Sequence, residues 1–262
     1  LDGSSVIPFA SGELVARCWK SFENLVCLKE IGSSSDLARE LMELYFGEDQ
    51  KLLPTVILAE SQTRARGRKG DPWRAPANQG IYFTFVRPAA SDEPLSLVPI
   101  AVARWIRDAI FDATRVSAVL KWPNDLYVGR KKLAGVIAES RTQGEDTYIA
   151  VGLGLNVAGR GSDLGVDGAT TVSEEAGRPI GVAPLAQAIL DRLDRELTDP
   201  HWQLEVERWE KSAAHHPGDR LTIRRGDREL TGEYRGLSPE GFLRLATGSG
   251  ETVIATGELA KW

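Results

Sequence analysis

Apolar and polar residues follow two different patterns along this chain, and the pattern changes at Pro217-Gly218. Before that point, apolar or alternating runs are interleaved with segments whose apolar residues recur every three or four positions. This combination predicts strands and amphipathic helices. After it, short runs are separated by glycine-containing turns, which is typical of a small antiparallel barrel. We therefore expect one domain over residues 1–216 and a second over residues 217–262.

The spacing of apolar residues predicts the individual elements. Strands are expected in the first domain at 25–31, 55–60, 81–86, 117–121, 126–128, 133–138 and 148–157. Helices are expected at 12–19, from Asp36 to about Tyr45, at 98–110, 183–197 and 201–214. In the second domain, short strands are expected at 221–223, 229–234, 242–245 and 252–254. The helix opened by Asp36 should bury one face, formed by Leu37, Leu41, Leu44 and Tyr45. The run 55–60 is mostly apolar, so we expect it inside the sheet.

The densest group of candidate reactive residues is Lys-Trp-Pro-Asn-Asp, at positions 121–125. A strand should end before Pro123, because proline cannot donate a hydrogen bond to a β-ladder. The chain should then turn back at Gly129-Arg130 and gather Lys121, Lys132, an amide and a carboxylate at one end of a hairpin. Lysines that offset phosphate charge, beside a carboxylate that can hold a metal, suit nucleotide chemistry. A solvated surface hairpin is the alternative interpretation.

Two further segments carry polar groups at predicted strand ends. Ser33-Ser34-Ser35 precedes a helix, where one hydroxyl can cap the first turn and Asp36 complements the helix dipole. The other hydroxyls can bind a small polar ligand. Four basic residues lie within Arg64–Lys69, and Trp73 follows them. This segment is either a solvated loop or a mobile one that folds over an anionic ligand.

The strand predicted at 148–157 contains Gly152 and Gly154. It is not a dinucleotide-binding fingerprint, because Val157 takes the third glycine position and no helix is expected after it. Two glycines inside a strand more often mark the close approach of a ligand or another backbone. Asn156, at the end of the strand, would face the same space. The chain contains neither a P-loop nor a GxSxG nucleophile elbow.

Composition limits the classes of function. The formal net charge is −5 and the pI about 5.4, so no overall field attracts the protein to nucleic acid or an anionic membrane. No apolar run approaches the roughly 18 residues of a membrane span, and no secretory signal is evident. We expect a cytoplasmic protein in which Cys18 and Cys27 are free thiols. His201, His215 and His216 lack partners at metal-ligand spacing, so we expect no zinc site.

Taken in order, these segments resemble those of the biotin protein ligases, which attach biotin to carboxylase carrier domains. That family has a Ser-Thr-Asn-like turn, a GRGRxGRxW loop, KWPND, K-L-x-G and G-x-G-I-N. The corresponding segments of this chain are Ser33–Ser35, Ala65–Trp73, Lys121–Asp125, Lys132–Gly135 and Gly152–Asn156. The resemblance covers roughly residues 25–262. It implies an α+β fold with a central mixed β-sheet, flanking helices and a small C-terminal SH3-like β-barrel.

The resemblance also implies an activity: ATP, with Mg²⁺, activates biotin to biotinyl-5′-AMP, and biotin then passes to a lysine of a biotin carboxyl carrier domain. The implied catalytic residues are Lys132, Arg68, Lys121 and Asp125. The implied biotin site consists of Ser33, Ser34, Ser35, Gln62, Arg66, Gly67, Arg68, Lys132, Gly135, Gly152 and Gly154. The implied ATP site consists of Arg68, Trp73, Lys121, Asn124, Asp125 and Asn156. No residue is implied as a dedicated metal ligand.

The chain departs from the family pattern in its loop and its serine turn. Ala65 stands where glycine is usual, which restricts φ, and Asp71-Pro72 stands where a basic pair is common. We expect the altered loop to hold the adenylate less tightly or to close more slowly. The serine turn lacks the usual Thr and Asn. Too few residues precede Leu25 for a helix-turn-helix, so we expect a ligase without a DNA-binding module or nucleic-acid partner.

Two other functions stay open at this point. A lipoate or octanoate ligase shares the fold and the adenylate chemistry, but an acyl tail needs an apolar tunnel rather than several hydroxyls and Gln62. A non-catalytic protein that senses biotin or its adenylate is supported by the altered loop alone. The acceptor protein and the oligomeric state cannot be read from the sequence; a homodimer, which many members of the family form, is one option.

Overall fold

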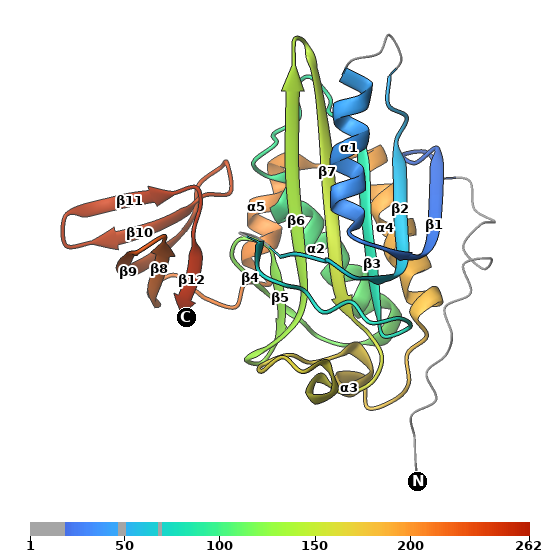
Figure 1. The fold of residues 1–262 in the computed structure, drawn as a ribbon. Helices are drawn as coiled ribbons and strands as arrows, with labels where there is room; N and C mark the ends of the chain where they lie inside the picture. The colour runs from blue at the N-terminus through green and yellow to red at the C-terminus, as the bar shows by residue number, and fades with distance from the viewer. Residues whose placement is uncertain (1–18, 47–50, 68–69) are drawn as a thin grey trace.

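The computed structural model describes residues 19–46, 51–67 and 70–262. In these ranges the chain forms a seven-stranded sheet with helices on both faces and a five-stranded sheet beside it (Figure 1). The predicted α+β class is confirmed. Most of the helix predicted at 12–19, together with Cys18, Arg68 and Lys69, lies outside the described residues.

The larger sheet is mixed, with the strand order β1-β2-β3-β7-β6-β5-β4. Its strands are β1 (Asn24–Ile31), β2 (Thr55–Gln62), β3 (Gly80–Pro88), β4 (Val119–Lys121), β5 (Asp125–Val128), β6 (Lys131–Gln143) and β7 (Asp146–Asn156). β1 and β2 pair in parallel, and the other neighbours pair antiparallel. β2 lies inside the sheet as predicted, because Val56 and Leu58 join the core on one face while Ile57 joins the core on the other.

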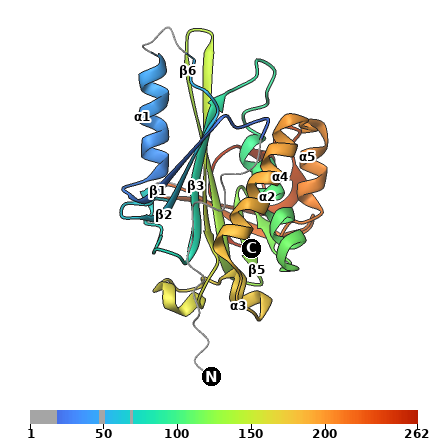
Figure 2. The same ribbon diagram turned by 90° about the vertical axis from the view of Figure 1, so that its right-hand side faces the viewer.

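Helices cover both faces of this sheet (Figure 2). The helices are α1 (Ser34–Phe46), α2 (Val98–Thr114), α3 (Val172–Ala176), α4 (Val182–Thr198) and α5 (Trp202–Glu210). α1 packs alone on one face, whereas α2, α4 and α5 pack on the other. The predicted apolar face of α1 is partly wrong: Ala38 and Met42 are fully buried, and Leu44 is 59% exposed. Because the side chain of Ala38 is small, α1 can approach the sheet closely, and the helix face that contains Ala38 and Met42 is the one that packs against it.

Two other element predictions need correction. α5 ends at Glu210 rather than near residue 214, because the following segment pairs with β4. There, Leu120 N donates to Ser212 O at 2.8 Å, and Ala214 N donates to Leu120 O at 2.8 Å. The short α3 and the 3₁₀ turn at Gly161–Leu164 were not predicted, since neither is long enough to show helical periodicity.

The smaller sheet is antiparallel, with the order β11-β10-β9-β8-β12. Its strands are β8 (Arg220–Arg225), β9 (Arg228–Leu237), β10 (Leu243–Thr247), β11 (Gly250–Ile254) and β12 (Glu258–Lys261). It confirms the antiparallel unit predicted after residue 217, although β11 and β12 are its two edges and do not close a ring of hydrogen bonds. β12 was not predicted. The sheet stands beside β4, β5 and α5 (Figure 1).

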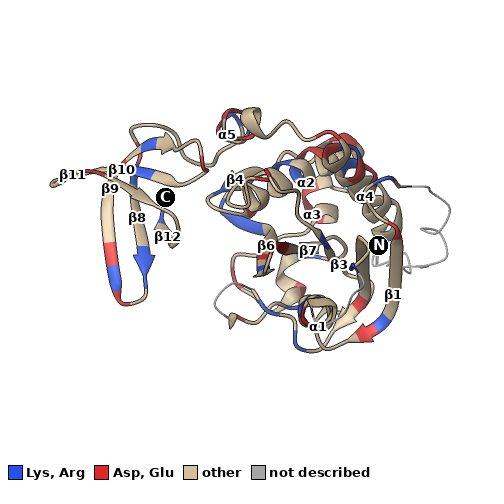
Figure 3. Cartoon of the chain, turned by 90° about the horizontal axis from the view of Figure 1, so that it is seen from above, with Lys and Arg blue, Asp and Glu red and all other residues tan. Residues whose placement is uncertain are grey.

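Charged side chains of both signs are spread over the two sheets (Figure 3), in keeping with the small net charge. None of the helices in the described ranges is both long and apolar enough to cross a membrane. Cys27 is a free, half-buried thiol; burial is the main cause of its raised pKa, and Glu60 adds to it.

His215 lies where α5 meets the smaller sheet. It is 1% exposed and packs between the rings of Trp209 and Tyr234, with centroid distances of 5.7 and 4.7 Å. Neither ring nitrogen has a hydrogen-bond partner among the described residues. Burial therefore disfavours the imidazolium and lowers the pKa of His215 to about 4.

This depressed pKa makes stability depend on pH. Between pH 6.5 and pH 4 the unfolded chain binds a proton at His215 that the folded chain does not, so stability falls as the pH falls. From pH 7 to pH 5 we expect the wild type to lose about 2 kcal/mol more unfolding free energy than His215→Phe. Urea denaturation at both pH values measures this difference. The exposed neighbour provides the control, since His216→Gln should keep the wild-type dependence; an equal loss in His215→Phe and wild type would contradict the assignment.

Candidate active site

Most of the predicted site residues line a single cavity of about 270 Å³. It lies over one end of β6 and β7, between the β4–β5 turn and the segment that follows β2. The predicted residues in its lining are Ser33, Ser34, Ser35, Gln62, Arg66, Gly67, Trp73, Lys121, Asn124, Asp125, Lys132, Gly135, Gly152 and Gly154. They come from segments far apart in the sequence, and the sheet brings them together.

The floor of the cavity is a strip of sheet without side chains. Gly135 on β6 pairs directly with Gly154 on β7, and Gly152 lies two positions further along β7 on the same face. A Cβ atom at Gly152 would lie 2.8 Å from Ser35 Oγ, and one at Gly154 would lie 2.6 Å from the Trp73 ring. The glycines therefore let these two side chains rest against the backbone, whereas the sequence predicted the close approach of a ligand or another backbone.

Hydroxyl groups line the end of the cavity at α1. Ser33 caps the helix, because its Oγ accepts from Asp36 N at 3.3 Å. Ser34 and Ser35 both contact the hydroxyl of Thr84, with oxygen–oxygen distances of 2.8 and 3.1 Å. Gln62 Oε1 accepts from Ser34 N at 2.7 Å, which leaves its amide nitrogen available to a ligand. This group offers fixed donors and acceptors to a compact polar ligand.

Charged groups lie on the same face of the β4–β5–β6 sheet. Lys121 pairs with Asp125 in the β-ladder, and Tyr127 pairs with Lys132. Lys132 Nζ lies 2.9 Å from Asp125 Oδ2, and both side chains are partly exposed to the cavity. The Lys121 ammonium lies over the Tyr127 ring, 5.1 Å from its centroid. Two cations and one carboxylate thus lie on one face of this part of the sheet.

Arg66 is turned away from these lysines. Its guanidinium donates to both carboxylate oxygens of Asp36 at 2.5 and 2.7 Å, at the first turn of α1. Asp36 also accepts from Arg39, which pairs in turn with Glu139 on β6. Burial opposes ionisation of Asp36, but the hydrogen bonds from Arg66 and Arg39 outweigh it and hold the pKa of this carboxyl below its usual value.

A second cavity of about 310 Å³ adjoins the first and shares Pro72, Trp73, Lys132 and Val166 with it. Asn156 lines this second cavity rather than the first, and its Nδ2 donates to the Thr170 carbonyl at 3.1 Å. Trp73 Nε1 is buried without a hydrogen-bond partner among the described residues. This edge of the indole lies against β7, since a Cβ built at Gly154 would be 2.7 Å from Nε1.

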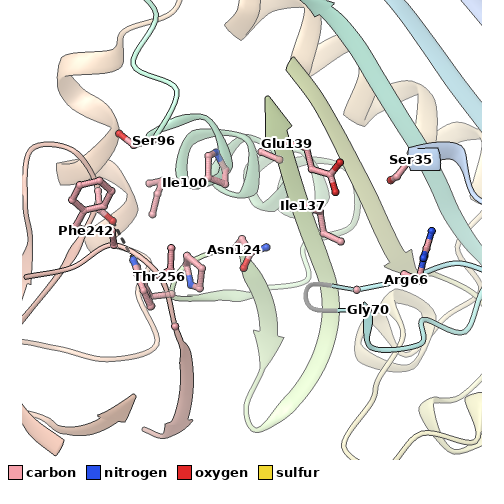
Figure 4. Close-up of a pocket in the computed structure, with 18 of the residues that line it drawn as sticks. Ser35, Arg66, Gly70, Ser96, Ile100, Asn124, Ile137, Glu139, Phe242 and Thr256 are labelled. Atoms are coloured by element: carbon pink, nitrogen blue, oxygen red, sulfur yellow. Dashed lines mark hydrogen bonds between the residues drawn. The ribbon is translucent and has the colours of Figure 1, made fainter. Parts of the chain in front are cut away.

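A larger cleft of about 720 Å³ opens from the α1 side of the same site. Ser35 and Arg66 lie at one end, Asn124 and Ile137 in the middle, and Phe242 and Thr256 of the smaller sheet at the other end (Figure 4). The cleft shares Ser35, Arg66 and Asn124 with the 270 Å³ cavity, so the two adjoin. The side chain of Asn124 contributes to the shape of the cleft, because the amide nitrogen donates to the Val136 carbonyl.

The comparisons with known proteins agree with this geometry. Residues 33–156 match the family described as "Biotin/lipoate A/B protein ligase family", and residues 217–262 match "Biotin protein ligase C terminal domain". The chain belongs to the biotin protein ligase family. The match starts at the first serine of the site, ends at Asn156, and resumes at the segment that forms the smaller sheet.

Named relatives fall in the same family. The chain is 28% identical to the "Bifunctional ligase/repressor BirA" of Bacillus subtilis, over 78% of this chain and 65% of that protein. It is 28% identical to the "Biotin--[acetyl-CoA-carboxylase] ligase" of Paracoccus denitrificans, over 78% of this chain and 88% of that protein. The biotin protein ligase of Aquifex aeolicus, solved with biotin and ATP, aligns with a TM-score of 0.74 and 26% identity, over 91% of this chain and 98% of that one. The chain thus spans slightly less than two thirds of the Bacillus protein.

Several residues of this biotin ligase site were not predicted from the sequence. Thr84 connects the two serines, but a threonine in an alternating strand gives no signal of its own. Glu258 and Leu259 reach the cavity from β12, a strand too short and polar to be recognised. Val166 lines both cavities from a loop. The predicted role of Arg68 falls outside the described residues, and the binding roles assigned to the other residues stay predictions.

The contact between β7 and Trp73 gives a structural prediction. We expect Gly154→Ala to displace the indole, because the new Cβ would lie 2.6 Å from its ring. The displaced indole becomes wetter, so tryptophan emission should shift to longer wavelength, and the shift should vanish in a Trp73→Phe background. Gly248→Ala is the matched control, since a Cβ there has no neighbour within 4 Å. An unshifted spectrum in folded Gly154→Ala would show that the backbone yields instead.

Proposed function

We propose that this protein is a biotin protein ligase: it converts biotin and ATP into biotinyl-5′-AMP and then transfers biotin to a lysine of a biotin carboxyl carrier domain. The observation that carries this proposal is the arrangement of the two cavities. A slot with a hydroxyl-lined end and a glycine floor leads to the Lys132–Asp125 pair, and a second cavity beyond it begins at Trp73.

The first cavity has the chemistry that biotin requires. Its ureido ring is compact and polar, so it needs fixed hydrogen-bond partners in an otherwise apolar slot. Ser33, Ser34, Ser35 and Gln62 supply these partners, and Gly135, Gly152 and Gly154 let the ring lie against the backbone. The apolar side chain of Ile137, which pairs with Gly152 on the cavity face of the sheet, would contact the valeryl chain. The biotin carboxylate would then extend toward Lys132.

In the first step, a carboxylate oxygen of biotin attacks the α-phosphorus of ATP and pyrophosphate leaves. Two anions must approach each other, and charge develops on the phosphoryl oxygens, so fixed positive charge lowers the barrier. Lys132 and Lys121 would supply it from the sheet, and Arg66 and Arg68 would add theirs from the loop. The Trp73 ring would stack on the nucleotide base, and Asn124 and Asn156 would contact the ribose and phosphate.

Mg²⁺ would enter bound to the triphosphate rather than to a protein cage. Asp125 is a carboxylate at the reactive end of the cavity, and its pairing with Lys132 orients it. In the second step the acceptor lysine amine attacks the acyl carbon, AMP leaves and an amide forms. Asp125 lies where it can orient that amine, and the 720 Å³ cleft provides the path by which an acceptor would arrive.

Further features of the proposal concern the whole protein. We infer that it acts in the cytoplasm, where its free Cys27 thiol is stable and carrier domains are made. The division into a catalytic domain over 1–216 and a C-terminal domain over 217–262 is part of the proposal. Pairing into a homodimer and the lack of a nucleic-acid partner stay predictions.

The test supplies the protein with ATP, Mg²⁺ and one acid at a time and follows pyrophosphate release. We expect release with biotin, because the hydroxyl groups match its ureido ring, and none with lipoate or octanoate. Biotin should then appear on a purified carrier domain. Release with lipoate or octanoate alone would assign the protein to lipoate ligation, and no release with any acid would make it a non-catalytic biotin-binding protein.

A comparison of the adjacent residues Lys131 and Lys132 tests whether the rate depends on one positioned lysine or only on the total positive charge. Lys132 faces the cavity beside Asp125, whereas Lys131 is exposed and pairs with Glu174 at 3.1 Å. We expect Lys132→Ala to slow adenylate formation by at least about 10²-fold, the scale for losing one preorganised charge. Lys131→Ala removes the same charge from the next position and should leave the rate close to wild type. Pyrophosphate release under saturating biotin and ATP measures both rates; similar rates in the two variants would remove Lys132 from the chemistry.

A further inference from the structure

Trp262 lies outside every motif of the site, yet its ring lies against a cavity residue. It follows β12, the strand of the smaller sheet whose Glu258 and Leu259 line the 270 Å³ cavity. The Lys121 ammonium lies 5.6 Å from the centroid of the Trp262 ring and 5.1 Å from that of Tyr127. The two rings meet edge to face, with centroids 5.2 Å apart and an interplanar angle of 78°. Lys121 thus lies against two aromatic rings, one from each sheet.

The Trp262 ring is itself held in place. The Arg130 guanidinium lies 4.5 Å from its centroid, and Arg130 also donates a hydrogen bond to the backbone carbonyl of Trp262. Because Arg130 lies at the tip of the β5–β6 hairpin, this contact ties the end of β12 to the hairpin that carries the reactive residues. Burial, with a smaller contribution from Asp125 and Glu258, raises the pKa of Tyr127 to about 12, so that ring stays neutral.

Both cavity lysines contact aromatic rings, since Lys132 Nζ also lies 5.5 Å from the centroid of the Trp73 ring. Lys132 is held by the carboxylate of Asp125, whose negative charge offsets its own. An aromatic ring attracts a cation through its quadrupole and adds no net charge. The ring contacts can thus help to fix the Lys121 ammonium without adding a negative charge of their own.

We propose that Trp262 is a positioning residue for Lys121: its ring, with that of Tyr127, holds the ammonium at the edge of the cavity where the anionic reactants meet. The role in turnover rests on the proposed function, whereas the contact itself does not. Trp262, which follows the last strand of the smaller sheet, would then contribute to adenylate formation through its contact with Lys121.

The test compares Trp262→Phe with Trp262→Leu in the full chain. Phe keeps an aromatic face and Leu keeps apolar bulk without one. We expect Leu to lower kcat/KM for biotin-dependent pyrophosphate release by about 5- to 30-fold, the range for losing a partly to fully desolvated cation–π contact, and Phe to stay within about threefold of wild type. In a Lys121→Ala background, Trp262→Leu should cost no further activity, because it acts through that lysine. An equal cost with and without Lys121 would overturn the proposal.

A second measurement does not depend on turnover. Ring currents should shift the ε-methylene protons of Lys121 upfield in the NMR spectrum of the wild type, and Trp262→Leu should return them toward their ordinary position. Trp262→Phe should keep part of the shift. A Lys121 signal that does not move in Trp262→Leu would refute the contact. If the wild type released no pyrophosphate with any acid, the proposed function would fail while this measurement still decided the contact.

Discussion

The site depends on three backbone positions that lack side chains. Gly135 and Gly154 face each other across β6 and β7, and Gly152 continues the strip toward α1. Everything that forms the cavity walls is arranged around this bare strip: Ser35 closes one end and Trp73 lies on the other. A methyl group at Gly152 or Gly154 would overlap the side chain of Ser35 or of Trp73. These side chains can pack closely over β7 only because the strand has no side chain at the two positions.

A second constraint follows from gathering cations around a small space. Like charges repel in a partly desolvated cavity, so each needs a partner that fixes it. Two kinds of partner occur: Lys132 and Arg66 pair with the carboxylates of Asp125 and Asp36, and Lys121 lies against aromatic rings, as Lys132 also does at Trp73. The Arg66 guanidinium pairs with Asp36 and not with a residue near the two lysines. A phosphate group of a ligand would therefore have to compete with Asp36 for Arg66.

The sequence predicted the features that depend on local chemistry. Pro123 ends β4, Gly129 turns the hairpin, and Ser33 caps α1, because each of these effects is set by one residue and its neighbours. What could not be predicted depends on partners far along the chain. Thr84 matters because β3 places it opposite Gly152, and α5 stops early because β4 captures the residues after it. Neither partner is marked by periodicity.

The smaller sheet is part of the site rather than an addition to it. Trp122 is buried between the two sheets and donates from Nε1 to the Gly241 carbonyl at 3.1 Å. Gly241 has a φ of +80°, and a Cβ there would lie 2.9 Å from Leu97, so its turn fits against α2 only as glycine. Since Trp122 lies between Lys121 and the reactive turn, any movement of the smaller sheet must also move the hairpin that carries Lys121 and Asp125. The geometry of this hairpin and the attachment of the C-terminal sheet therefore depend on the same packing contacts around Trp122 and Gly241.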